Sequence, residues 1–481
     1  MTTEIARMSA LDLLSRFRTR ELSPVEATRA ALDCIAEGDP RLNAFCRVDA
    51  EAALRQARAS EARWRKNEPA GLLDGIPVSI KDLVLAAGWP TLRGSLTIAR
   101  DQAWDEDAPA VARLREHGAV LLGKTTTPEF GWKGATDSLL TGITRNPWNN
   151  DLTPGGSSGG AAVALASGMG ALAIGTDGAG SIRIPASFTG VFGLKATNGV
   201  VPAHPPSPIG TLANAGPMAR TVADCALMLG VIGRFDPRDP HAQPVPAPDY
   251  LTGLDDGVAG LRIAFSPDFG HVRVHAEVAD CVARAVQALE GQGAKVEIVD
   301  LPMHDAVDAV GVLWPVGNAH GLRSLSTAQR ALLDPGLLAM AAAAEGMSAL
   351  SYLAAVSARE RVQIRMNKLF AKFDLLVTPT MPMPAFPVGR PAPEPADEGV
   401  AWSAFTYPFN LTMQPAASAP CGFTSAGLPV GLQIVGQRFA DALVLRAARA
   451  YERVAPFRMP WDGIAPLPSS QGTAGHDGAA R

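Results

Sequence analysis

Two serine-bearing glycine runs and one lysine are the residues of this chain whose types and spacing could do chemistry. Residues 154–160 read PGGSSGG, residues 175–185 read GTDGAGSIRIP, and Lys81 lies near the end of the apolar segment 75–82, GIPVSIKD. A serine hydroxyl becomes a nucleophile when a neighbouring base removes its proton. A lysine can be that base when burial disfavours its ammonium form. Together the segments predict acyl transfer through a serine, although Lys81 taken alone better fits a surface pair with Asp82.

The segment before Ser181 has the composition of an oxyanion-binding loop. Gly178, Ala179 and Gly180 follow an expected strand at 171–176. Small residues leave consecutive backbone N–H groups free to turn toward one point, where they can stabilise an oxyanion. Taken alone, the segment also fits an ordinary glycine-rich turn.

The segment 118–125, GAVLLGKT, satisfies the phosphate-binding pattern G-x-x-x-x-G-K-T. A phosphate-binding loop follows a strand and begins a helix. Here a helix-like segment precedes the motif, its middle residues are themselves strand-like, and TTP follows. The sequence therefore favours a structural strand that ends at Lys124 over a nucleotide site.

The segment 155–159, GGSSG, fits the nucleophile elbow of α/β-hydrolases. That elbow needs a strand directly before the serine, and an acid and a histidine after it. A polar segment, 145–151, precedes Ser157 instead, and no histidine lies near either serine loop in the sequence. A histidine-dependent hydrolase remains open because later histidines could approach in space. These are His204, His241, His271, His275, His304 and His320.

Helices and strands are expected to alternate along most of the chain. Residues 1–70 read as helical, with Ser23 as N-cap, Pro24 at the first helical position and Glu26 three residues after the cap. Segment 75–82 is short, β-branched and bounded by turn residues, as in a strand. Further helices are expected at 107–117, 221–233, 277–292, 351–371 and 440–454, and strands at 119–122, 261–265, 295–299, 374–378 and 430–435. This alternation predicts an α/β fold with a largely buried sheet.

Composition limits the classes of partner. The chain has 43 basic and 47 acidic side chains, so no electrostatic footprint for nucleic acid is expected and a small substrate fits better. Five scattered cysteines show no metal-ligand spacing, which favours a reduced, cytoplasmic protein without a metal. The uncharged run 152–176 contains Pro154 and seven glycines and is expected to form a buried helix and strand rather than a membrane span. Residues 464–481 read as a disordered tail.

The three motifs together resemble the amidase signature family, serine hydrolases with a Ser-cisSer-Lys triad. The family's nucleophile lies 24 residues after the first serine of GGSSGG, which here leads from Ser157 to Ser181. Strong similarity covers about residues 71–200, and GLPVGLQ at 427–433 resembles the family's C-terminal segment. The resemblance implies one large domain over residues 1–463 with a mixed β-sheet flanked by helices. Residues 1–70 would form its helical N-terminal part and 71–200 its signature core.

The resemblance also implies roles for individual residues. Ser181 would be the nucleophile, Ser157 a bridging serine after a cis peptide, and Lys81 the base. The oxyanion hole would consist of the backbone N–H groups of Gly178, Ala179, Gly180 and Ser181, with Asp177 and Arg183 supporting that loop. Ala179 departs from the family, because many members have glycine there and a positive φ would be strained for alanine. The residues Gly131 and Trp132 would contact the substrate, although Trp132 alone could equally be a core residue. Trp314 and 401–410 are weaker candidates.

The implied activity is hydrolysis of the C–N bond of aryl or aliphatic linear carboxamides through an acyl-enzyme, with carbamates or esters as side activities. No cofactor or metal is expected, the partner would be a small-molecule amide, and a homodimer is allowed. The alternative is the glutamine-hydrolysing component of a tRNA-dependent amidotransferase, which resembles the family equally in its triad.

Overall fold

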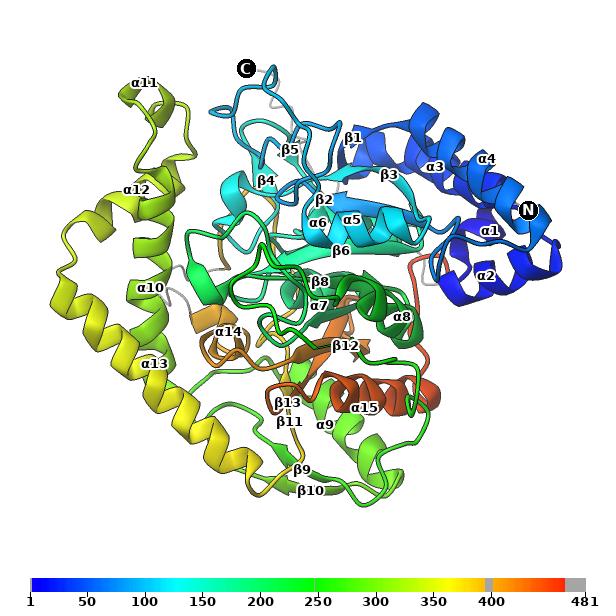
Figure 1. Ribbon diagram of the computed structural model, residues 1–481. Coiled ribbons are helices and arrows are strands. Elements are labelled where there is room, and N and C mark those ends of the chain that lie inside the picture. Colours follow the sequence, from blue (N-terminus) through cyan, green and yellow to red (C-terminus); the bar gives the residue numbers. More distant parts are fainter. Residues whose placement is uncertain (1, 246, 394–400, 463–481) are drawn as a thin grey trace, which may run out of the picture.

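The strands of the protein form one mixed sheet, as a computed structural model of residues 2–245, 247–393 and 401–462 describes it (Figure 1). Its 11 strands lie in the order β1-β3-β2-β6-β8-β7-β12-β13-β11-β9-β10. They are β1 (Phe45–Val48), β2 (Pro77–Lys81), β3 (Val120–Thr125), β6 (Leu172–Asp177), β7 (Phe192–Lys195), β8 (Asn214–Ala219), β9 (Arg262–Phe265), β10 (Lys295–Ile298), β11 (Leu375–Pro379), β12 (Ala416–Phe423) and β13 (Pro429–Gly436). A separate pair comprises β4 (Asp137–Ser138) and β5 (Gly142–Ile143).

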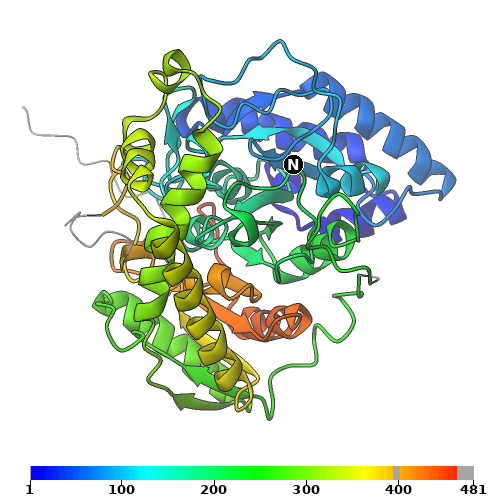
Figure 2. The ribbon, with the colours of Figure 1, turned by 60° about the vertical axis from the view of Figure 1, so that its left-hand side comes forward.

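Helices flank this sheet. They are α1 (Thr2–Arg7), α2 (Ala10–Thr19), α3 (Pro24–Leu42), α4 (Ala50–Lys66), α5 (Pro109–Glu116), α6 (Gly159–Ala166), α7 (Arg183–Thr189), α8 (Val222–Ile232), α9 (Ala276–Gly291), α10 (His304–Leu322), α11 (Thr327–Arg330), α12 (Pro335–Glu345), α13 (Ala349–Phe370), α14 (Pro408–Leu411) and α15 (Asp441–Val454). In Figures 1 and 2, α10, α12 and α13 lie together on the side of the molecule away from α1–α4. The expected α/β fold with a mixed sheet is confirmed.

Local signals set several element boundaries as expected. Ser23 caps α3 in a capping box, in which its hydroxyl accepts from the Glu26 N–H and the Glu26 carboxylate accepts from the Ser23 N–H. The motif at 118–125 lies in β3, which contains Lys124 and ends one residue later, so the structural strand is confirmed. The run 152–176 contains the fully buried helix α6 and most of β6, also as expected.

The parallel pairing of β2 with β6 positions the candidate site. The two strands are neighbours in register, with Ile80 opposite Ile174. Because parallel strands end at the same edge of a sheet, Lys81 at the end of β2 and Asp177 at the end of β6 emerge side by side. The α6 helix packs against both strands and carries the first serine run to the same edge.

No single helix among the described residues combines the length and hydropathy needed to cross a bilayer, although the pair α12 and α13, bent by 104°, meets both criteria together. The tail expected at 464–481 lies outside the described residues.

Candidate active site

Lys81 lies at the centre of a buried cluster of hydroxyl groups. Its Nζ atom lies 2.8 Å from each of three oxygens, which are Ser157 Oγ, Ser158 Oγ and Thr176 Oγ1. The lysine is fully buried. Its neighbour Asp82 does not pair with it but lies 3.7 Å from Lys124. The surface pair with Asp82 is therefore wrong, and Lys81 meets the serine run instead.

Burial decides the protonation of Lys81. It lowers the pKa of Lys81 well below the usual 10.5, and the negative charge of Asp177 opposes that shift only in part. A lowered pKa is what a lysine needs to accept a proton near neutral pH.

The first serine run delivers two hydroxyl groups to Lys81. The peptide bond between Gly156 and Ser157 is cis, as the resemblance implied. Ser158 precedes α6, and its hydroxyl donates to the Thr176 carbonyl at 3.0 Å while accepting from the Thr176 N–H at 3.1 Å. The proton of Ser158 is thus committed to the backbone of β6. Ser157 has no hydrogen bond to a described residue besides that with Lys81.

A buried ion pair supports the second serine run. Asp177 forms a double hydrogen bond with Arg183, from Nε to Oδ2 and from Nη2 to Oδ1, both at 2.9 Å. Burial by itself would raise the pKa of Asp177. The charge and hydrogen bonds of Arg183, together with Lys195 and Asn410, outweigh burial and hold the pKa below its usual value. The other acceptors of Arg183 are the Thr406 carbonyl, Gln433 and Asn410. Residues from two distant segments thereby fix the loop between Asp177 and α7.

The backbone donors of this loop divide into two groups. Gly180, at φ +126°, donates its N–H to Asp177 Oδ1 at 2.7 Å, so in this structure it is not free to bind an oxyanion. The oxyanion hole expected from the sequence stays a prediction, and the Gly180 N–H would have to leave Asp177 to take part in it. The N–H groups of Gly178, Ala179 and Ser181 have no acceptor among the described residues. Ala179 does not have positive φ, so its replacement of glycine causes no backbone strain.

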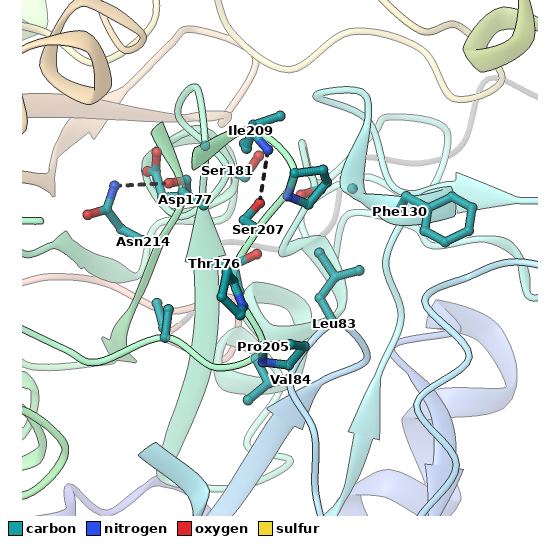
Figure 3. Close-up of a pocket in the computed structure, with 18 of the residues that line it drawn as sticks. Leu83, Val84, Phe130, Thr176, Asp177, Ser181, Pro205, Ser207, Ile209 and Asn214 are labelled. Atoms are coloured by element: carbon teal, nitrogen blue, oxygen red, sulfur yellow. Dashed lines mark hydrogen bonds between the residues drawn. The ribbon is translucent and has the colours of Figure 1, made fainter. Parts of the chain in front are cut away.

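Ser157 and Ser181 line one cavity of about 220 Å³. Figure 3 shows Leu83 and Phe130 on one side of it and Pro205, Ser207 and Ile209 on another. Its walls are mostly apolar, and the segment 202–209 and helix α10 contribute to them. The Ser158 N–H donates to the Ser181 carbonyl at 3.0 Å, which ties the two serine runs together beside the cavity.

The structure separates the two substrate-contact candidates. Gly131 lines the cavity at φ +73°, and a Cβ there would lie 3.1 Å from Ser157 Oγ. Trp132 does not line it. Its ring packs against α12 in an apolar cluster with Leu333 and Leu337. Of the weaker candidates, Trp314 lines the cavity, and a Cβ at Gly178 would lie 2.9 Å from its Cζ3 atom.

The segment 401–410 supports the serine loop rather than the cavity wall. Thr406 Oγ1 donates to the Ala179 carbonyl at 2.7 Å, and no described residue of the segment lines the cavity. Of the later histidines, His204 alone lines the described cavity, with Nε2 3.2 Å from Glu106 Oε1. Among the described residues, no histidine is hydrogen bonded to Ser157 or Ser181.

Sequence reasoning missed four residues that the structure brings to the site. Ser158 and Thr176 share Lys81 with Ser157, while Asn410 and Gln433 bind Arg183. The doubled serine of GGSSGG was a signal for Ser158, and the family-like GLPVGLQ segment was one for Gln433. Thr176 carried no local signal, and Asn410 lies in the segment 401–410, which was expected at the pocket and not at Arg183.

Comparison with known proteins places the chain in a family. The family model described as Amidase matches residues 26–445. The chain therefore belongs to the amidase family, the amidase signature enzymes, whose members act on amides.

Two curated relatives share one name, whereas the similar solved structures include both an aryl acylamidase and an amidotransferase A subunit. In Myxococcus xanthus, the A subunit of glutamyl-tRNA(Gln) amidotransferase is 37% identical over 94% of this chain and 98% of that protein. Its counterpart of the same name in Moorella thermoacetica is 37% identical over 96% and 100%. A bacterial aryl acylamidase of the amidase signature family superposes with a TM-score of 0.87 at 32% identity, covering 93% of this chain and 96% of that chain. The curated names fit the amidotransferase alternative better than the free amidase.

Proposed function

We propose that the chain hydrolyses carboxamides through an acyl-enzyme on Ser181, with Ser157 as proton relay and Lys81 as base. One observation carries the proposal. Buried Lys81 lies within hydrogen-bonding distance of Ser157, and Ser157 and Ser181 line the same cavity. The same chemistry serves both the amidase and the glutamine-hydrolysing function, so the cavity must decide between them.

Hydrogen bonding around Lys81 supports the direction of proton flow. A neutral amine has two N–H donors and one lone pair, whereas three hydroxyl oxygens lie 2.8 Å from Nζ. One hydroxyl must therefore donate to the neutral lysine. Ser158 cannot, because its proton is used by the Thr176 carbonyl. Ser157 and Thr176 each lack another described partner for the hydroxyl group. We assign the donating role to Ser157, in line with the family resemblance of the GGSSGG run.

The reaction then follows in balanced steps. Ser181 Oγ bonds to the amide carbon while its proton passes to Ser157, and the Ser157 proton passes to Lys81. The N–H groups of Gly178, Ala179 and Ser181 are the candidates for binding the oxyanion. As the C–N bond breaks, the proton returns through Ser157 to the leaving amine. Water hydrolyses the acyl-enzyme by the same relay.

The lining of the cavity favours a largely apolar amide. Among the described lining residues, the charged or titratable side chains are Arg93, Asp177 and His204, and both Asp177 and His204 already have partners. Free glutamine carries an α-ammonium group, and no described lining carboxylate is left to pair with it. An aryl or aliphatic carboxamide suits this surface better.

Hydrolysis of glutamine as part of a tRNA-dependent complex is the second candidate. The observation in its favour is that several curated relatives, matched over nearly their whole length, carry the name of that amidotransferase component. This candidate requires a partner protein, whereas the amidase requires none.

One assay tests both candidates. The isolated chain would be incubated with benzamide, acetanilide, a phenyl carbamate and glutamine, and release of ammonia or amine measured. Turnover of simple amides without turnover of glutamine supports the amidase; glutamine turnover alone supports the amidotransferase component. Ser181→Ala should abolish either activity. Ser79→Ala is the matched control, because that hydroxyl is buried on β2 without a hydrogen-bond partner. Wild-type turnover in Ser181→Ala would overturn the mechanism.

A further inference from the structure

Arg93 is a charged residue in the wall of the reaction cavity that the proposed mechanism does not use. It lies in the segment after β2, and its carbonyl accepts from the Phe130 N–H at 2.8 Å. Phe130 and Gly131 line the same cavity, and Gly131 abuts Ser157. Arg93 therefore belongs to the wall that faces the proposed proton relay.

The guanidinium of Arg93 has no hydrogen bond or ion pair with any described residue. This distinguishes it from Arg183, which is buried nearby and binds Asp177, Asn410, Gln433 and a carbonyl. Burial lowers the pKa of Arg93 from its usual value, with the charge of Asp82 opposing the shift. Arginine nevertheless remains charged in proteins. The nearby carboxylate, Asp82, already faces Lys124 at 3.7 Å. A partly buried cation that shares its counter-charge in this way gains from a ligand that supplies another.

No other described group of the cavity wall compensates this charge. Asp177 is held by Arg183 and by the Gly180 N–H. His204 lies 3.2 Å from Glu106, which also pairs with Arg238 at 2.9 Å. The rest of the wall is mostly apolar. The cavity thus combines a mostly apolar surface with one cationic residue, Arg93, whose side chain has no hydrogen bond or ion pair with a described residue.

We propose that Arg93 is a specificity-determining residue that binds a carboxylate of the substrate, so that the preferred substrates are apolar amides carrying an acid group. The inference rests on the proposed amide hydrolysis and names the substrate class of that site. A guanidinium presents two parallel N–H donors that match the two oxygens of a carboxylate, which gives orientation as well as affinity. Fixing the far end of the substrate in this way would orient its amide toward Ser181.

The inference also bears on glutamine. Its α-carboxylate would suit Arg93, but its α-ammonium group would lie beside the same positive charge with no uncommitted carboxylate among the described lining residues. A dicarboxylic acid monoamide, or an anilide with an acid group, satisfies Arg93 without this repulsion.

Matched pairs of neutral and acidic amides test the proposal. The first pair is 4-carboxybenzamide and 4-methylbenzamide, which places the carboxylate on the acyl side. The second is N-benzoyl-4-aminobenzoate and N-benzoyl-4-toluidine, which places it on the amine side. Values of kcat/KM would be measured for the wild type, Arg93→Gln and Arg93→Lys. Arg100→Gln is the matched control, because it removes the same charge from an exposed residue outside this cavity.

We expect the wild type to prefer the acidic member of at least one pair, and Arg93→Gln to reduce that preference by about 10- to 100-fold, chiefly through KM. Arg93→Lys should restore part of the preference, since it keeps the charge but not the paired donors. Arg100→Gln should retain the wild-type preference. Equal preference in the wild type and Arg93→Gln for both pairs would overturn the inference.

Binding separates this inference from the proposed function. Calorimetric titration of Ser181→Ala with each amide measures recognition without turnover, and the same titration of the Arg93→Gln, Ser181→Ala double variant measures the contribution of Arg93. Arg93-dependent binding of the acidic amide, combined with no wild-type turnover, supports the carboxylate site and contradicts the proposed hydrolysis. Turnover without any Arg93-dependent binding supports the proposed hydrolysis and contradicts the carboxylate site. Failure to bind either amide of both pairs counts against the inference.

Discussion

The Nζ atom of Lys81 lies 2.8 Å from the Oγ1 atom of Thr176, although 95 residues separate the two in the sequence. The contact exists because β2 and β6 are parallel neighbours that end at one edge of the sheet. Thr176 and Ser158 therefore position the lysine beside Ser157, the residue proposed to exchange a proton with it.

Two buried lysines on adjacent strands should respond differently to the same substitution. Lys81→Met should lower kcat by at least about 100-fold, because the proposed base is lost. Lys124→Met should instead destabilise the fold by roughly 3 kcal/mol, because Lys124 is the cation that faces buried Asp82. Urea unfolding and steady-state kinetics of both variants measure the contrast. A larger loss of stability in Lys81→Met than in Lys124→Met would contradict it.

The pH dependence of the reaction should report the lysine. Activity requires neutral Lys81, so kcat/KM should rise with pH and level off well below 10.5, because burial lowers the pKa of Lys81. Below that pKa the protonated lysine cannot accept a proton, and the rate falls. A pH profile with a neutral amide substrate tests this, and a rate that declines steadily as pH rises above about 6 is incompatible with a lysine base.

A single methyl group at Gly131 should block the relay. In Gly131→Ala the new Cβ would lie 2.9 Å from Leu83 Cδ1 and 3.1 Å from Ser157 Oγ, so Ser157 must shift. We expect kcat/KM to fall by about 100-fold or more, since small misplacements in an active site have effects of this size. Gly88→Ala is the control, because Gly88 also has positive φ but nothing lies within 4 Å of its Cβ position. Both variants should lose about 1 kcal/mol of stability from backbone strain, and similar activities would contradict the proposed contact.

The buried ion pair should matter far more than an exposed one of the same length. Arg183→Met leaves Asp177 buried without its cation and should cost roughly 3–5 kcal/mol of stability, together with the activity. Arg361 and Asp305 also lie 2.9 Å apart, but the Arg361 side chain is 55% exposed. Arg361→Met should therefore cost less than about 1 kcal/mol. Chemical denaturation of the two variants gives the comparison, and equal losses would mean that Asp177 is not held by Arg183 in solution.

Lys195 should make stability depend on pH. Burial lowers the pKa of Lys195 to about 7 in the folded protein, whereas an exposed lysine in the unfolded chain titrates near about 10.4. Between these values the unfolded state binds one more proton, so this residue contributes stability that rises with pH by up to about 1.4 kcal/mol per unit. Lys195→Met should flatten the rise between pH of about 7 and 9. An identical slope in the variant and the wild type would exclude this contribution.

Elements set by local chemistry could be predicted from the sequence, and those set by distant partners could not. The start of α3 follows from Ser23 and Glu26 alone, and β2 from its apolar, β-branched run. The strand β1 went unpredicted and interrupts the part expected to be helical, residues 1–70. The strands β7, β8 and β12 went unpredicted because they are short or rich in glycine, alanine and proline. Each is a strand because it pairs with strands elsewhere in the chain, as Ala417 of β12 does with Leu194 of β7.

The candidate site, too, contains residues whose positions the sequence predicts and residues whose positions depend on distant partners. The three motifs predicted that Lys81 and Ser157 would meet, and the structure brings them together. Trp132 is an aromatic residue next to Gly131 and was expected at the pocket, yet its ring packs against α12 and does not line the cavity. The commitment of the Gly180 N–H to Asp177 depends on a φ of +126° that glycine permits but does not dictate. Contacts such as that of the Trp132 ring with α12 depend on how distant segments pack together, so the local sequence does not predict them.

Helix α10 reaches the cavity from a part of the chain far from the serine motifs. It contributes Trp314, Asn318 and Leu322 to the wall, whereas the groups proposed to move protons all lie between residues 81 and 181. This part of the wall can therefore change without altering any residue of the proposed proton relay. Recombination at the two ends of α10 would therefore change the substrate range while the proposed catalytic residues stay the same.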